Sequence, residues 1–341
     1  MRSSRTALVA LLAALPLVLA SCSDSGSDTA SSPSSASTPG ASASSGDSTT
    51  VCDPVQGNDL VALADDLNLQ KSDNIVPVVR TAVLTDPLSN ALDKVSSVLS
   101  QDALNGLNKA TDVDRQQPAE AAAAFVKDQS LTDGLSGGSG PIRVVAANFS
   151  ENQTLANVYA DVLKGAGFDA TVVQLTNREV YEAALEKKDV DVVPEYAATL
   201  TEFLNKKVNG ASAPTKASGD IDTTVAALKE LAAPLGLTPL TPAEATDQNA
   251  FAVTKAFADK YSVTSLSELA SACGGGVTLG GPAECPTRDY CQLGLTSTYG
   301  LKITGFTSLD AGGALSKNAL KTGKVAMALV FSSDASLVPS S

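Results

Sequence analysis

The sequence predicts an α/β protein with two lobes, and three observations support this prediction. Short β-rich runs alternate with helix-spaced apolar runs between residues 142 and 206, and a second series of this kind starts at Asn249. Of the 341 residues, 43% are apolar and 18% are charged, which is typical of a globular chain. Removing roughly 50 low-complexity residues leaves about 290, and at about 150 residues per domain this length indicates two domains.

The first series alternates strands with helices. We expect strands over 142–146, 170–173 and 190–193, and helices over 154–166, 178–187 and 197–206. Gly165 and Gly167 close the first of these helices, because glycine is favoured at helix ends. Strands that alternate with helices predict a mainly parallel sheet covered on both faces.

The second series and the segment before residue 142 supply the remaining elements. In the second series we expect strands over 249–254, 277–279 and 325–330, and helices over 255–261 and 265–272. Earlier in the chain, 60–63 and 75–79 are β-rich, and 87–126 is a run of helices. Helix-start signals stand at Ser100 and Asp114, the second with Pro118 near its first turn.

Glycine and serine dominate the segment between this helical run and the strand at 142–146. By composition, residues 134–141 form a flexible linker. A phosphate-cradling loop is the alternative, but no Lys-Ser or Lys-Thr pair follows the glycines and no strand precedes them. We therefore expect a linker.

The composition excludes several classes of function. The chain has no His, so Ser-His-Asp and Cys-His catalysis, imidazole-ligated metals and histidine pH switches are excluded. With 24 basic and 37 acidic residues the net charge is −13, which argues against a nucleic-acid partner. A hydrolase or transferase using Glu151, Glu195 or Asp310 is the enzyme alternative, but no spacing places two of these acids around a scissile bond. We expect no catalysis, no cofactor and no metal.

The start of the chain indicates export and anchoring. Arg2 and Arg5 precede an apolar run of about 14 residues, too short to span a bilayer comfortably and typical of a signal peptide. It ends in Leu-Ala-Ser-Cys22, which looks like a bacterial lipobox, so we expect lipidation of Cys22; an ordinary signal with an incidental Cys is the alternative. Residues 23–50 are almost entirely small and polar and predict a disordered tether. The chain is expected at the outer face of the cytoplasmic membrane.

Several motifs after the tether are recognisable. They are Asn148–Asn152, Asn177–Tyr181, Asp191–Thr199, Asp247–Val253, Gly280–Cys285, Leu309–Gly313 and Phe331–Asp334. In this order they resemble the substrate-binding proteins of osmoprotectant ABC importers, which carry glycine betaine, choline or carnitine. The resemblance implies a two-lobed periplasmic-binding-protein-like fold of type II, the Venus flytrap kind.

The position of one block, residues 60–129, differs from the order of elements typical of that family. Elements like those of 60–129 normally follow the Ser-Ser-Asp motif, whereas here they come first. We expect a circular permutation, since domains with neighbouring termini tolerate it; the alternative is a missing C-terminal part and an unrelated helical domain in front. The expected order is signal 1–22, tether 23–50, permuted block 51–133 contributing mostly to the first lobe, linker 134–141, first lobe 142–240 and second lobe 241–341.

Four cysteines follow Cys22. In an exported chain an even number predicts two disulfides, with three possible pairings. The loop from Cys285 to Cys291 resembles a bridged loop in some family members, which implies the pairs Cys285–Cys291 and Cys52–Cys273. A zinc site is the alternative and would need four thiolates in a reducing setting.

The resemblance implies a ligand cleft between the lobes. It places Asn148, Asn152, Arg178, Tyr196 and Thr199 on the first wall, and Asn249, Asp310, Lys317, Phe331 and Asp334 on the opposite wall. Each side chain also has a structural alternative as a helix cap, ion-pair partner, core or turn residue.

Betaine and choline binders hold the quaternary ammonium in an aromatic cage. Tyr196 and Phe331 fit such a cage, but Asn249 and Lys317 stand where tyrosines are common, and a lysine would repel the ammonium. We therefore expect a different small polar ligand, hydroxylated or anionic.

The resulting expectation is a monomeric, lipid-anchored solute-binding protein that serves an ABC permease. A sensing or adhesion lipoprotein with the same fold is the alternative.

Overall fold

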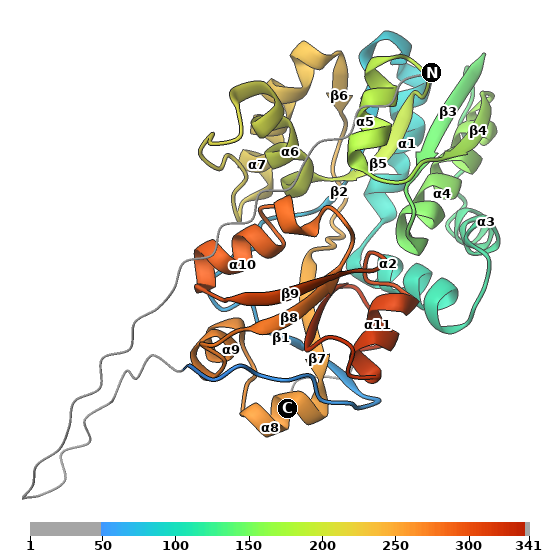
Figure 1. Cartoon of the computed structure of the whole chain (residues 1–341). Helices are drawn as coiled ribbons and strands as arrows, with labels where there is room; N and C mark the ends of the chain where they lie inside the picture. The colour runs from blue at the N-terminus through green and yellow to red at the C-terminus, as the bar shows by residue number, and fades with distance from the viewer. Residues whose placement is uncertain (1–48, 338–341) are drawn as a thin grey trace, which may run out of the picture. The chain divides into compact units, whose positions relative to one another are not determined.

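The computed structural model describes residues 49–337, and these belong to one compact unit (Figure 1). The predicted signal peptide, Cys22 and nearly all of the predicted tether lie outside the described residues. Within residues 49–337, no helix combines the length and the apolar composition needed to cross a bilayer.

Two five-stranded sheets form the two lobes. The first has the order β4-β3-β5-β2-β6, with β2 Ile75–Arg80, β3 Pro141–Ala146, β4 Asp169–Gln174, β5 Val192–Tyr196 and β6 Leu237–Pro239. Strands β4, β3 and β5 pair in parallel, whereas β2 pairs antiparallel with both β5 and β6. Four strands of this sheet therefore run in one direction and β2 runs against them, which agrees with a mainly parallel sheet.

The second sheet repeats this pattern. Its order is β1-β7-β10-β8-β9, with β1 Leu60–Leu63, β7 Asn249–Thr254, β8 Val277–Gly281, β9 Ile303–Ser308 and β10 Met327–Phe331. Here β7 is the reversed strand, since it pairs antiparallel with β1 and β10, while β8 pairs in parallel with β10 and β9.

Helices cover both faces of each sheet (Figure 1). Those of the first lobe are α1 Asp86–Val98, α2 Gln101–Asn108, α3 Pro118–Asp128, α4 Ser150–Ala166, α5 Arg178–Glu186, α6 Ala197–Asn209 and α7 Ile221–Ala232. Those of the second are α8 Lys255–Tyr261, α9 Leu266–Ala272, α10 Gln292–Tyr299 and α11 Ala314–Lys321. In β3, Val144 packs with α1 and α4 while Val145 packs with α5 and α6, so neighbouring residues on both faces of the strand are apolar.

Local signals explain several helix ends. The Ser100 side chain accepts from the Ala103 N–H at the start of α2, as predicted. The helix expected from Asp114 begins only at Pro118, because residues 109–113 continue the preceding helix as a π-turn. Elements β6, β9, α7, α10 and α11 were not predicted individually, since their short or mixed patterns lack a clear period.

The segment 51–133 divides between the lobes. Strand β1 joins the second sheet, and Val51 forms a bridge with Gly276 of the same lobe. Strand β2 and helices α1–α3 belong to the first lobe. The chain therefore crosses between lobes through residues 64–74, and it crosses back through 240–248.

The glycine-rich segment predicted as a linker makes specific contacts with the first lobe. The Gly138 N–H donates to the Ala166 carbonyl at 2.9 Å, and a Cβ at Gly138 would meet the Phe168 ring at 2.5 Å. Gly134, Gly137 and Gly140 all have positive φ, a region that glycine enters without strain. Glycine is therefore used here for close packing and tight turns.

Both predicted disulfides are present. Cys52–Cys273 joins residues 221 positions apart in sequence and attaches the start of the described chain to the second lobe. Cys285–Cys291 closes a short loop whose residues face the cleft.

Candidate functional site

A cleft of about 830 Å³ lies between the two lobes. The wall from the first lobe consists of the loop before α4, the start of α5, and the end of β5 with α6. The wall from the second lobe consists of the start of β7, the loop 282–291 and the segment after β9. Seven of the ten predicted ligand residues line it: Asn148, Arg178, Tyr196, Thr199, Asn249, Asp310 and Phe331.

Arg178 forms the charged centre of the first wall. Its Nε donates to Glu195 Oε1 at 2.9 Å, and its Nη2 donates to Glu195 Oε2 at 2.7 Å and to Thr199 Oγ1 at 3.0 Å. Tyr181 donates to the same carboxylate at 2.7 Å. Burial alone would lower the pKa of Arg178, but the Glu195 carboxylate raises it well above its usual value. The guanidinium is therefore held charged and is satisfied within the protein.

Aromatic rings form a second feature of the cleft. Phe149 lies between Phe331 and Tyr196, with ring centroids 5.4 Å and 6.1 Å away. Phe149 comes from the first lobe and Phe331 from the end of β10 in the second, so this row of rings crosses the cleft. Ring faces attract cations, and their edges and faces also pack against apolar groups.

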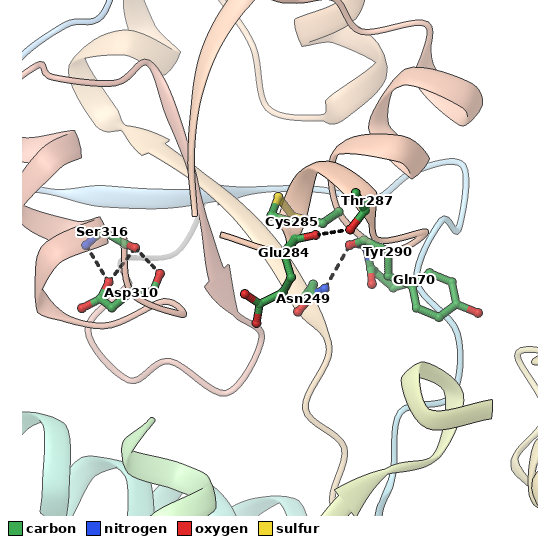
Figure 2. Close-up of a disulfide and its surroundings, with 9 residues drawn as sticks. Gln70, Asn249, Glu284, Cys285, Thr287, Tyr290, Asp310 and Ser316 are labelled. Atoms are coloured by element: carbon green, nitrogen blue, oxygen red, sulfur yellow. Dashed lines mark hydrogen bonds between the residues drawn. A yellow bond between two sulfur atoms is a disulfide. The ribbon is translucent and has the colours of Figure 1, made fainter. Parts of the chain in front are cut away.

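The opposite wall is built around the loop 285–291. Figure 2 shows the Asn249 amide donating to the Tyr290 carbonyl, a bond of 3.0 Å. It also shows Asp310 bonded to Ser316, where the Asp310 carboxylate accepts from the backbone and hydroxyl of the first turn of α11. Among the described residues, the Glu284 carboxylate forms no hydrogen bond or close ion pair, and its charge counters the lowering of the Arg288 pKa by burial.

Three predicted ligand residues do not line this cleft. Asn152 is buried beneath the wall, where it accepts from the Ala147 N–H at 2.7 Å and donates to the Pro194 carbonyl at 2.8 Å. Lys317 and Asp334 form an ion pair of 2.6 Å, and Asp334 lines an adjoining cavity of about 240 Å³ that shares Asn148, Phe149 and Phe331 with the cleft. Because its charge is paired outside the cleft, Lys317 does not supply the repulsion of an ammonium group that the sequence led us to expect.

Side chains from both lobes meet at the base of the cleft. Glu151 of α4 accepts from Tyr196 at 2.7 Å, from Asn108 at 2.6 Å and from Ser333 at 3.1 Å, and Ser333 follows β10 of the second lobe. Burial, followed by the charge of Glu151, raises the pKa of Asp247 well above its usual value. Burial also raises the pKa of Glu151. The two carboxyl groups therefore share an environment that disfavours two charges, and Asp247 lies on the crossing segment 240–248.

Asp73 lies on the other crossing segment. Its carboxylate accepts from the Thr199 N–H at 3.0 Å, and its backbone carbonyl accepts from the Asp247 N–H at 3.1 Å. Burial raises the pKa of Asp73 to about 7, in spite of these donors and the positive charge of Arg178.

Sequence reasoning missed several cleft residues. Phe149, Glu284 and Tyr290 stand inside quoted motifs or the cysteine loop, yet nothing in their spacing marks them as cleft-facing. Tyr290 is buried, and its hydroxyl has no hydrogen-bond partner among residues 49–337. In the same range, no cluster of three or more Cys, Asp or Glu side chains could hold a metal ion.

Two solved structures show similarity to this chain. One, described as a glycine betaine/carnitine/choline ABC transporter, is 20% identical and the match covers 56% of this chain and 68% of that chain, with a TM-score of 0.35. The other, a substrate-binding protein from Microbacterium hydrocarbonoxydans complexed with 4-hydroxybenzoate hydrazide, is 16% identical over 55% of this chain and 46% of that chain, with a TM-score of 0.26. A comparison with curated proteins finds no significant match.

A family model gives the assignment. The model for the substrate-binding domain of the ABC-type glycine betaine transport system matches residues 54–128 and 140–339, well over half of the chain. The chain belongs to this family of substrate-binding domains.

Proposed function

We propose that this protein captures a small polar, osmoprotectant-type solute in the cleft and delivers it to the permease of an ABC importer. The observation that supports this most directly is the cleft itself, which both lobes line and which combines a row of rings with unpartnered polar groups. Such a site suits a ligand with an apolar body and a few polar atoms.

The charges of the cleft favour a neutral, zwitterionic or cationic solute over an anion. All four lysine and arginine side chains that line it are paired with protein carboxylates: Arg178 with Glu195, Lys206 with Asp289, Lys207 with Glu182 and Glu186, and Arg288 with Glu179. The Glu284 carboxylate has no such partner among the described residues. An anion would therefore have to break an ion pair, whereas a cation would find aromatic faces and the Glu284 carboxylate, whose charge also acts on Arg288.

A solute screen tests this proposal. We would measure the melting temperature of the full chain with choline as a cation, glycine betaine as a zwitterion, sorbitol as a neutral polyol and 4-hydroxybenzoate as an anion. A ligand at 100 times its Kd should add about 2.7 kcal/mol of stability. Phe331→Ala should reduce the shift, while Tyr261→Ala, which alters a ring packed on Phe257 outside the cleft, should keep it. Binding of the anion alone would contradict the charge argument.

We also propose that Cys22 carries a lipid that anchors the protein outside the cell. The support is the Leu-Ala-Ser-Cys22 sequence after an apolar run. Labelling cells with radioactive palmitate should mark the protein, and Cys22→Ser should abolish the label and release the protein from membranes. A labelled Cys22→Ser variant would refute the anchor.

We propose, finally, that the chain is circularly permuted relative to its family. Leu337, the last described residue, packs in the same apolar cluster as Leu60 of β1, so it lies beside the block that would follow it in the family order. A variant that joins Ser341 to Thr49 through a short linker and opens the chain at Gly137 should fold, with a melting temperature within about 10 °C of the parent. Failure of this variant to fold would argue against the permutation.

A further inference from the structure

The disulfide-closed loop 285–291 is held firmly on its own lobe. Cys285–Cys291 closes it covalently. The Tyr290 carbonyl accepts from both the Asn249 amide, at 3.0 Å, and the Gln70 amide, at 3.1 Å. The loop therefore projects its side chains from a constrained base.

Three consecutive residues of this loop reach the first lobe. Arg288 forms an ion pair of 2.7 Å with Glu179 at the start of α5. Asp289 forms an ion pair of 2.6 Å with Lys206 of α6. Tyr290 is buried, and the carboxyl groups whose charges act on it include Glu202 of α6 and Asp73 of the crossing segment 64–74.

Arg288 has a second contact across the cleft. Its guanidinium carbon lies 5.3 Å from the centre of the Phe203 ring of α6, within the range of a cation–π interaction. The Arg288 side chain is 22% exposed, whereas that of Glu179 is 46% exposed. Arg288 is thus the more enclosed partner and contacts two helices of the facing lobe.

We propose that the loop 285–291 is a latch that holds the cleft closed over its solute, with Arg288 as the positioning residue. The inference rests on the proposed function, since a latch has a purpose only where a solute is retained. Its contacts join the lobes at the edge of the cleft, and both ion pairs would separate when the lobes part. The disulfide supports the latch by limiting the conformations of the loop before closure, so that less entropy is lost.

The latch can be tested without any solute by amide hydrogen exchange of the full, disulfide-intact chain. The amides to follow lie in peptides covering 176–183 and 282–291. Arg288→Ala and Glu179→Ala should each speed their exchange about twofold to fivefold, the range expected for a partly exposed ion pair. The double variant should show less than the product of the two effects, because both changes break one interaction.

A matched control separates the latch from general loss of charge. Lys164→Ala breaks an exposed ion pair with Asp161 inside a single helix, and it should leave exchange at both peptides unchanged. If Arg288→Ala reduces folding, Glu179→Gln provides the same test from the other partner. Wild-type exchange in both Glu179 variants, or independent effects of the two alanine changes, would overturn the proposal. Because no solute is added, a failed latch is distinguishable from a failed solute screen.

Discussion

Replacing Asp73 by Asn should make the protein more stable at neutral pH and change little in acid. Asp73 is only 3% exposed, and burial raises its pKa from 3.8 to about 7. In the folded protein the carboxyl therefore keeps its proton up to about pH 7, while in the unfolded chain it loses the proton near pH 4. The stability that this group contributes is full below pH 4 and is lost as the pH rises to 7 and beyond.

The size of the effect follows from the two pKa values. One pKa unit corresponds to about 1.4 kcal/mol, so a change from 3.8 to about 7 amounts to about 4 kcal/mol. Asparagine is neutral at every pH, and its side-chain oxygen can still accept from the Thr199 N–H. The difference in unfolding free energy between Asp73→Asn and wild type should therefore grow by about 4 kcal/mol between pH 3 and pH 8.

Urea unfolding under non-reducing conditions, repeated across this pH range, measures the difference. Asp220→Asn is a matched control with the opposite sign. Asp220 caps α7 by accepting from the Thr223 hydroxyl at 2.6 Å and from the Thr223 N–H at 2.8 Å, and these bonds lower its pKa. Its contribution is thus present above the unfolded pKa and is lost as the pH falls. A pH-independent difference between wild type and Asp73→Asn would refute our account of the buried carboxyl.

Three further perturbations probe the cleft. Arg178→Met should lower the free energy of unfolding, measured in urea, by about 3–5 kcal/mol, because it leaves Glu195 charged and buried without its partner. A loss below about 1 kcal/mol would show that the ion pair does not stabilise the fold. Phe331→Ala should weaken choline binding about threefold to tenfold in calorimetry, since one ring face is lost, and unchanged affinity would place the cation elsewhere. Replacing Cys285 and Cys291 by Ser should lower stability by about 2 kcal/mol and speed amide exchange across the loop; unchanged exchange would mean that the disulfide does not restrain the loop.

The regular parts of the fold could be predicted from the sequence because their signals are local. Ile142 to Ala146 is a β-rich run, and the structure buries Val144 and Val145 on opposite faces of the sheet, each against helices. Ser100 and Pro118 mark helix starts through capping and a preset φ, which depend only on neighbouring residues. The sequence does not mark strand β9, because every residue in it is half-buried or exposed and its apolar pattern is weak.

The candidate site was predicted less completely. Arg178, Tyr196 and Phe331 were placed on the cleft through the family motifs, and the structure places them there. The sequence predicts that Lys317 repels an ammonium ligand. It cannot show that the Asp334 carboxylate lies 2.6 Å from the Lys317 ammonium group and pairs with it. Ion pairing depends on distances between separate elements, and no periodicity encodes those distances.

The sequence by itself determined the α/β class, the likeness to osmoprotectant-binding proteins, and the exclusion of histidine chemistry, since these follow from composition, period and motif. Only the tertiary structure decided which charges remain available to a ligand. Arg178 and Arg288 both line the cleft, but they form ion pairs with Glu195 and Glu179. No described residue forms a close ion pair with the Glu284 carboxylate. The physical reason is that electrostatic interactions depend on separation and burial in space, which folding sets between residues far apart in the chain.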